Sequence, residues 1–233
     1  MRPAHLALLL VLVAGGLTLP TAVNADEHDD ISAALRMMPD PVNGKRLFRT
    51  CVQCHGAQRA GLAGGWVPEI AGQYRDVLVK ELIDYRHGVR WDLRMEVVAS
   101  RHVLASVHDI VDVATYVASL APAPSGRTGS GEWAQAGARV YAAQCAACHG
   151  ATAQGNSSGI PRMAGQNFDY LLRQFHDAIE GRRPNMGVVH VERLKTLDMR
   201  ELTGLADYLS RLPVGRASAG QAAMPAMRKI PQA

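Results

Sequence analysis

Apolar residues recur at helical spacing in four stretches of the chain, which fall into two similar pairs. The first pair covers residues 77–85 and 110–120, and the second covers residues 170–179 and 202–212. No stretch shows the alternation of apolar and polar residues that is typical of a half-buried strand. The pattern therefore predicts an all-α protein that contains two similar sets of helices.

The two sets belong to an internal repeat that spans most of the chain. Cys51 is followed at an offset of 94 residues by Cys145, and each begins the pattern Cys-x-x-Cys-His-Gly. The segment Pro-Glu-Ile-Ala-Gly-Gln that begins at Pro68 is matched at an offset of 93 by Pro-Arg-Met-Ala-Gly-Gln at Pro161. An offset that changes so little over so long a span predicts two duplicated domains.

Changes in composition mark the ends of these domains. Residues 122–131 contain mostly Pro, Ser, Gly, Ala and Thr, and therefore predict a linker. We place the first domain at residues 26–121 and the second at residues 132–212. Residues 213–233 are rich in Ala, Gly and Pro without a helical period, which predicts a C-terminal tail.

The N-terminus has the order of a secretory signal. Arg2 precedes an apolar run at residues 6–14, and small residues lead to Ala25, after which the chain becomes acidic. We expect residues 1–25 to be a signal peptide that is cleaved after Ala25, so that the protein is exported. The alternative is an uncleaved membrane anchor, which the shortness of the run and its glycines disfavour.

Composition and charge change this picture little. The chain has 233 residues and a formal net charge of +4, and Arg2 would be lost with the signal peptide. The remaining balance is too small to indicate a nucleic-acid partner. Aromatic residues make up 5% of the chain, which agrees with small domains whose core is completed by a large cofactor.

All four cysteines of the chain lie in two Cys-x-x-Cys-His motifs, one in each predicted domain. Two thiols at this spacing can add to the two vinyl groups of one porphyrin, and the adjoining imidazole then binds the iron. We therefore expect two covalently bound haem c groups. The attachment residues are expected to be Cys51, Cys54, Cys145 and Cys148, and the iron ligands His55 and His149.

Two other kinds of chemistry use the same residue types. A Cys-x-x-Cys pair can form a redox-active disulfide, but that function is typical of a βαβ setting, and this chain is predicted to be helical. Four cysteines can also hold one zinc ion, but here a histidine adjoins each pair and each pair lies in its own domain. Haem attachment accounts for both of these features.

The second axial ligand of each iron should occur at corresponding places in the two repeats. Met95 lies 40 residues after His55, and Met186 lies 37 residues after His149, each just beyond a matched Gly-x-Arg segment. We therefore expect Met95 and Met186 to be the distal ligands. A thioether ligand raises the reduction potential and closes the coordination shell, which suits electron transfer.

The remaining methionines and histidines are weaker candidates. Met163 and Met199 match Ile70 and Val107 in the other repeat, so we expect both methionines to fill the core. None of the rival histidines has a histidine at its repeat counterpart, and we expect ordinary surface or partly buried residues there. These rivals are His102, His108 and His190.

Two further features predict how each pocket is built. Pro68 and Pro161 follow the motif histidines by 13 and 12 residues, so a backbone carbonyl there can accept the imidazole N–H and fix the ring. A glycine and an aromatic residue lie one turn apart before each motif, which predicts a close approach by the helix that bears Tyr116 or Tyr208. These pairs are Gly44 with Phe48, and Gly137 with Tyr141.

With two Cys-x-x-Cys-His domains, a Pro-x-x-Ala-Gly-Gln segment after each motif, a distal methionine in each and a Pro/Gly-rich linker, the chain resembles the dihaem cytochrome c4 family over nearly all of the predicted mature protein. The resemblance implies two tandem class I cytochrome c domains related by pseudo-twofold symmetry. It also implies a periplasmic location, weak association with a membrane surface and electron transfer toward a terminal oxidase. The family commonly has a proline two residues after the distal methionine, whereas Val97 and Val188 stand there in this chain.

The predicted function is that of a freestanding electron carrier, not an enzyme, with one redox protein as donor and another as acceptor. One alternative is an electron-transfer subunit of a periplasmic dehydrogenase, because the haem subunit of flavocytochrome c sulfide dehydrogenase is similar. Another is a dihaem peroxidase or a thiosulfate-oxidising enzyme, which needs an iron with an open position or an unusual ligand.

Basic residues near the predicted distal methionines suggest a rim that docks an acidic partner or pairs with haem propionates. They are Arg86, Arg90, Arg94, Arg182 and Arg183.

Overall fold

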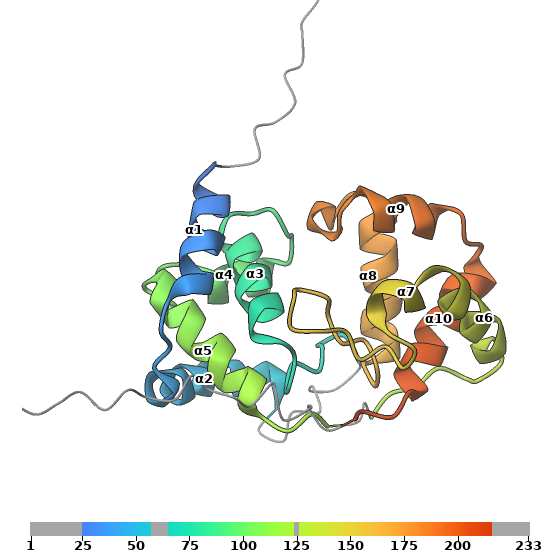
Figure 1. Cartoon of the computed structure of the whole chain (residues 1–233), viewed down its shortest axis with the longest axis horizontal. Helices are drawn as coiled ribbons and strands as arrows, with labels where there is room; N and C mark the ends of the chain where they lie inside the picture. The colour runs from blue at the N-terminus through green and yellow to red at the C-terminus, as the bar shows by residue number, and fades with distance from the viewer. Residues whose placement is uncertain (1–24, 57–64, 124–125, 216–233) are drawn as a thin grey trace, which may run out of the picture.

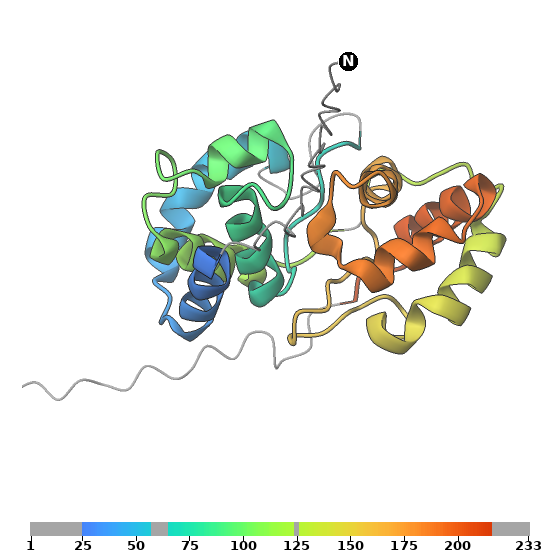
Figure 2. The same cartoon turned by 90° about the horizontal axis from the view of Figure 1, so that it is seen from above.

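The computed structural model describes residues 25–56, 65–123 and 126–215, which form two helical domains side by side (Figures 1 and 2). Within these residues the only β-structure is an isolated bridge between Asn156 and Ile160, so the prediction of an all-α fold is confirmed. The predicted signal peptide, apart from Ala25, and most of the predicted tail lie outside the described residues. No helix in the described part of the chain is long and apolar enough to cross a membrane.

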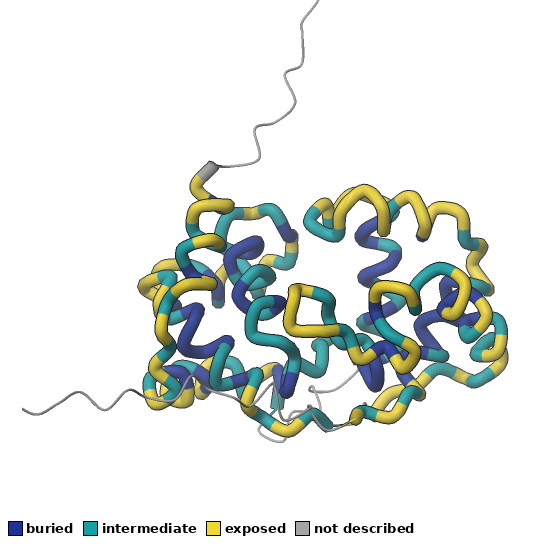
Figure 3. Tube along the Cα trace, viewed as in Figure 1, coloured by how far each residue is buried: buried dark blue, intermediate teal, exposed yellow. Residues whose placement is uncertain are grey.

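The first domain is built from helices with clear local signals. Asp40 caps the helix that carries the first motif, because its Oδ1 accepts the N–H groups of Val42 and Asn43, and Pro41 occupies the first helical position. The described helices of this domain are α1 (Ala25–Arg36), α2 (Pro41–His55), α3 (Arg75–Arg86), α4 (Leu93–Ala99) and α5 (Val107–Ser119). Each domain has its own buried core, as the two groups of buried positions in Figure 3 show.

The second domain repeats this plan with one break and one omission. The counterpart of α2 is divided into two helices, and the described residues contain no counterpart of α1. The elements are α6 (Ala134–Gln144), α7 (Ala146–His149), α8 (Phe168–Ile179), the 3₁₀ turn η1 (Pro184–Met186), α9 (Val188–Lys195) and α10 (Met199–Arg211). The four helices predicted from apolar periodicity are confirmed as α3, α5, α8 and α10. Helix α1 was not predicted, although its Ala34 is fully buried in the core of the first domain.

The predicted close approach of two helices is confirmed in both domains. A Cβ atom on Gly44 would lie 2.1 Å from the backbone oxygen of Asp112 in α5, and one on Gly137 would lie 1.9 Å from the backbone oxygen of Gly204 in α10. Only glycine permits this contact, because a real Cβ atom cannot come so close to another atom. The aromatic pairs that pack beside these crossings are Phe48 with Tyr116, at 5.4 Å between ring centroids, and Tyr141 with Tyr208, at 5.6 Å.

The glutamines that end the two Pro-x-x-Ala-Gly-Gln segments join the domains. The side chain of Gln73 donates to the backbone oxygen of Arg162 and accepts its N–H, both at 3.0 Å. The side chain of Gln166 makes the same two bonds with the backbone of Glu69, both at 2.8 Å. Since Arg162 and Glu69 hold the same place in the two segments, each repeat binds the other in the same way. This exchange agrees with pseudo-twofold symmetry.

Candidate haem sites

The Cys-x-x-Cys-His motifs end a helix in both domains but enter it differently. In the first domain α2 runs without interruption through the motif, whereas in the second the chain leaves the helix at Cys145, where φ is −118° and ψ is −35°. The break follows from a one-residue difference in spacing, since Phe48 lies three residues before Cys51 and Tyr141 lies four before Cys145. Because both aromatic residues pack on the last helix of their domain, the extra residue has to be absorbed between Tyr141 and the motif.

The two motif histidines are held by the predicted carbonyl groups. The Nδ1 atom of His55 lies 3.0 Å from the backbone oxygen of Pro68, and that of His149 lies 3.3 Å from the backbone oxygen of Pro161. A carbonyl oxygen can only accept, so the proton is on Nδ1 and the Nε2 lone pair is free to bind a metal. Burial lowers the pKa of both imidazoles and so favours their neutral, ligating form. Both residues therefore fit the proximal side of a haem.

The four cysteines have free thiols. Cys51 and Cys145 are partly buried against the cores of their domains, while Cys54 and Cys148 are exposed. Burial raises the pKa of Cys51 to about 11 and also raises the pKa of Cys145. One zinc site would need both cysteine pairs at the same place, and in the described part of the chain no three His, Cys, Asp or Glu side chains gather as a metal cluster. The residues therefore fit thioether attachment to haem better than a zinc site.

Met95, the predicted distal ligand of the first domain, is the third residue of α4. Asp92 caps this helix, since its Oδ1 accepts the N–H of Arg94 at 3.2 Å and that of Met95 at 3.4 Å. Arg86 holds the far end of α4, because its Nε donates to the backbone oxygen of Ala99 at 2.8 Å. Its Nη2 also donates to the backbone oxygen of Leu104 at 2.6 Å. The partly buried Met95 therefore sits on a helix that is fixed at both ends.

Methionines of the second domain occupy three different settings. Met186 ends η1, is partly buried and packs against the core of its domain. Met163 also packs against that core, as predicted. The expectation that Met199 fills the core is wrong, because its side chain is 59% exposed. Met199 is the first residue of α10.

The three rival histidines are exposed, as expected, but two of them make specific contacts. His108 donates from Nε2 to the backbone oxygen of Met38 at 2.7 Å and plays a local role, and His102 is exposed. The ring of His190, however, lies near that of His149, with 6.0 Å between the centroids and 75° between the planes. The repeat gives no sign of this contact, because no histidine stands at the counterpart of His190 in the first repeat.

The five arginines of the proposed basic rim differ in how far they are buried. Arg90 is only 5% exposed and Arg183 is largely buried, so the hypothesis that these two dock a partner is wrong. Arg86 is committed to the backbone of its own domain. Arg94, whose side chain is 73% exposed, and Arg182 remain accessible.

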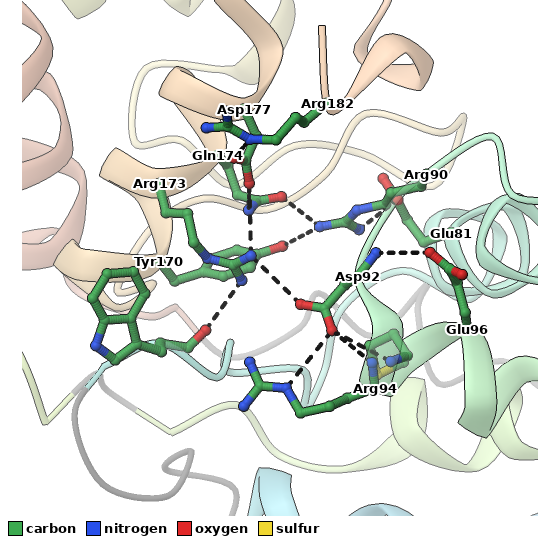
Figure 4. A network of polar contacts seen from close by, with 12 residues as sticks. Glu81, Arg90, Asp92, Arg94, Glu96, Tyr170, Arg173, Gln174, Asp177 and Arg182 are labelled. Atoms are coloured by element: carbon green, nitrogen blue, oxygen red, sulfur yellow. Dashed lines mark hydrogen bonds and ion pairs between the residues drawn. The ribbon is translucent and has the colours of Figure 1, made fainter. Parts of the chain in front are cut away.

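The buried arginines join the two domains in a network around Glu81, and Figure 4 shows the part of it that contains Arg90. Glu81 on α3 accepts from Arg90 of its own domain at 2.5 Å, from Arg183 of the other domain at 2.9 Å and from Asn185 at 3.1 Å. Burial alone would raise the pKa of Glu81, but the guanidinium groups of Arg90 and Arg183 outweigh burial and hold it well below its usual range. The carboxylate therefore stays charged between two cations. Next to Met186, Asn185 also donates to Asp84.

An arginine of the first domain likewise binds side chains of the second. Arg90 donates to the side-chain oxygen of Gln174 at 2.6 Å and to the Tyr170 hydroxyl at 2.8 Å, both on α8 (Figure 4). Gln174 holds the position in α8 that Glu81 holds in α3, and Arg90 and Arg183 hold matched positions in the loops that follow. The loop before each predicted distal methionine is thus bound by the other domain. These arginines are recognisable in the sequence, but their partners are not, because the partners lie in the other repeat.

The comparisons with known proteins agree with this structure. The family model "Cytochrome c" matches residues 41–121, and the model "Cytochrome C oxidase, cbb3-type, subunit III" matches residues 132–209. A thiosulfate dehydrogenase electron acceptor from Stutzerimonas stutzeri is 30% identical over 209 residues, which cover 80% of this chain and 93% of that protein.

Two solved structures share the fold. Reduced cytochrome c4 from Pseudomonas stutzeri is 25% identical with a TM-score of 0.65, and the match covers 75% of this chain and all of that one. A thiosulfate dehydrogenase from Marichromatium purpuratum is 27% identical with a TM-score of 0.67, over 75% of this chain and 41% of that one. Together with the two motifs, these matches imply two covalently bound haem c groups. They also support a function in electron transfer. The chain therefore belongs to the dihaem cytochrome c4 family, with two tandem cytochrome c domains.

Proposed function

We propose that this protein is a periplasmic electron carrier that takes up one electron at each of two haems and passes them to a redox partner, without catalysing a reaction on a substrate. The observation that supports this most strongly is the matched pair of buried histidines, each fixed by a carbonyl group. We propose that the chain is exported and cleaved after Ala25, so that the mature protein begins at Asp26 just inside α1. Contact with a membrane surface would be weak and peripheral.

Each residue of the two sites has a separate task in this proposal. The paired thiols of the first motif, Cys51 and Cys54, hold one haem covalently, and Cys145 and Cys148 hold the other. His55 and His149 bind the proximal side, where the carbonyl bonds keep each ring in one orientation and increase its basicity. The bound haem supplies an iron that changes oxidation state by one electron.

The distal side determines whether the iron transfers electrons or binds a substrate. Met95 is the proposed sixth ligand in the first domain. In the second domain the repeat proposes Met186, and His190 lies near enough to His149 to compete for the same position. Either residue would close the shell of the iron, which favours electron transfer over peroxidase or thiosulfate-oxidising activity.

The comparisons with known proteins support one class of electron donor. Since the Stutzerimonas stutzeri relative is a thiosulfate dehydrogenase electron acceptor that the chain covers almost completely, we propose a periplasmic dehydrogenase of this kind as one donor. A terminal oxidase remains the proposed acceptor. Among the described arginines near the haem sites, Arg94 and Arg182 are exposed enough to meet an acidic surface on either partner.

Stopped-flow reduction of the purified dihaem protein tests this function. A thiosulfate dehydrogenase with its substrate should reduce both haems, and a membrane oxidase should then reoxidise them, faster than the protein reacts with oxygen alone. Neutralising Arg94 should lower the association rate at low salt and lessen its dependence on salt, while the matched variant Arg101→Gln, also exposed, serves as the charge control. Turnover of peroxide or thiosulfate by the protein alone would contradict the proposal.

A further inference from the structure

Helices α4 and α9 hold the same place in the two domains, and their third residues are Met95 and His190. Helix α4 begins after Asp92 and α9 begins after Gly187, so each candidate lies three positions beyond its cap. Four residues later the chain enters the core in both domains, at Ala99 and at Leu194. Residues four apart share a helix face, so Met95 and His190 are both placed just above the buried end of their helix. By position in the helix, His190 is the counterpart of Met95.

Met186 does not occupy this position. It lies before α9, in the 3₁₀ turn, and four residues before His190. The first-domain residue four positions before Met95 is Trp91, whose indole does not bind iron. Met186 also already has a structural role, since it packs against the core of its domain.

The ring contact between His149 and His190 fits an ion held between them. An imidazole nitrogen lies about 2 Å from a metal ion that it binds, so two rings on opposite sides of one ion have centroids roughly 6 Å apart. The observed separation is 6.0 Å. Among the described residues no hydrogen bond occupies the ring nitrogens of His190, whereas the ring of His87 is bonded to Asp30 and that of His108 to a backbone oxygen. His190 therefore has ring nitrogens without a hydrogen bond in the described residues, and its ring lies beside the proximal ligand.

We infer that His190 is the distal ligand of the second iron, so that the protein carries one His/Met haem and one His/His haem. The inference rests on the proposed dihaem function and deepens it. A thioether ligand raises the reduction potential relative to a second imidazole, so the first domain would hold the more oxidising haem. Electrons that enter at the second domain would then move to the first. The two halves of the repeat would have different tasks although their folds match.

The test uses the oxidised full-length dihaem protein. The absorption band that marks a methionine–iron bond should have the intensity of one bond for two irons, and Met95→Leu should abolish it. Met186→Leu should leave both the band and the low-spin magnetic spectrum unchanged. His190→Ala should convert one iron to high spin, and His190→Met should double the methionine–iron band and raise the lower potential.

Two results would overturn the inference. One is a band of two bonds in the unmodified protein that Met186→Leu halves, which would identify Met186 as the ligand. The other is a fully low-spin spectrum in His190→Ala, which would mean that His190 only packs against His149. Because His190 is exposed, its replacement should not disturb folding, and the unmodified protein provides the first reading without any variant. The mass of the denatured protein reports separately whether two haems are attached, so failure of the dihaem proposal is distinguishable from failure of this ligand.

Discussion

Replacing Glu81 by glutamine should weaken the attachment of the two domains to each other. The change keeps the shape of the side chain but removes the charge that lies between Arg90 and Arg183. Arg90 is 5% exposed, so its guanidinium would remain buried without its closest carboxylate partner. The amide of glutamine can still accept one bond, but its NH₂ group would face the other guanidinium.

The size of the effect follows from these contacts. Removing one partner of a buried ion pair destabilises by about 3–5 kcal/mol. The Glu81 side chain is 22% exposed, so solvent screening favours the lower end, about 3 kcal/mol, or roughly a 100-fold change in the equilibrium between joined and separated domains. With the slopes usual for urea, the unfolding midpoint should fall by about 1 M.

Urea unfolding of the full-length dihaem protein measures this change. Far-ultraviolet circular dichroism and haem absorption should give one coincident transition in the unmodified protein and a lower or divided transition in Glu81→Gln. The matched control is Glu192→Gln, which removes an exposed ion pair with Lys195 and should change stability by less than about 1 kcal/mol. If the two variants were equally stable, the network would not hold the domains together.

The pH dependence of stability tests the role of Glu81 independently. The folded-state pKa of Glu81 is depressed, so its contribution to stability is present above its ordinary pKa of 4.5 and is lost as the pH falls below that value. The difference between Glu81→Gln and the unmodified protein should therefore shrink in acid. A difference that stayed constant down to pH 3 would refute the assignment of the effect to charge.

Three further changes have expected outcomes. Burial raises the pKa of Asp84 to about 6, so its contribution to stability should be lost as the pH rises from about 4 through 6. The urea midpoint of Asp84→Asn should not show this loss. Gly137→Ala should destabilise the second domain by about 3 kcal/mol or more, because the new Cβ would meet a backbone oxygen of α10, whereas Gly126→Ala has open space and should be nearly neutral in the same thermal unfolding assay. Arg86→Met should release the far end of α4 and weaken the methionine–iron band of Met95 at unchanged haem content; an undiminished band would show that Arg86 does not position this ligand.

Local patterns in the sequence were enough to predict much of the fold. The apolar faces of α3, α5, α8 and α10 were visible because helix periodicity is a property of neighbouring residues. Gly44 and Gly137 predicted the helix crossings, because a glycine one turn from an aromatic residue has a direct steric meaning. Helix α1 was missed because most of its residues are polar and only a few enter the core.

The contacts between the domains were beyond local reasoning. Gln73 and Gln166 were visible as a repeated motif, but nothing in the repeat says that each binds the backbone of the other copy. Arg90 and Arg183 were interpreted as a surface rim, since a run of basic residues gives no sign of a buried carboxylate such as Glu81 that lies elsewhere in the chain. These features depend on how the two domains are placed.

The distal side of the second haem shows a different limit. A search for the same residue type in both repeats selected Met186 to match Met95. The structure matches positions rather than types, and His190 holds the position of Met95 in α9. The choice between Met186 and His190 depends on which of these two kinds of match the iron follows, and the spectra proposed above decide it.

The central claim is that one chain holds two covalently attached haems with closed iron shells that each exchange one electron. A potentiometric titration of the purified protein, followed by optical and magnetic spectra and calibrated by the mass of the denatured chain, tests it directly. The account predicts a chain with two attached haems, two one-electron steps at separate potentials and low-spin iron throughout the oxidised protein. Haem that is lost on denaturation, or a high-spin iron in the unmodified protein, would contradict it.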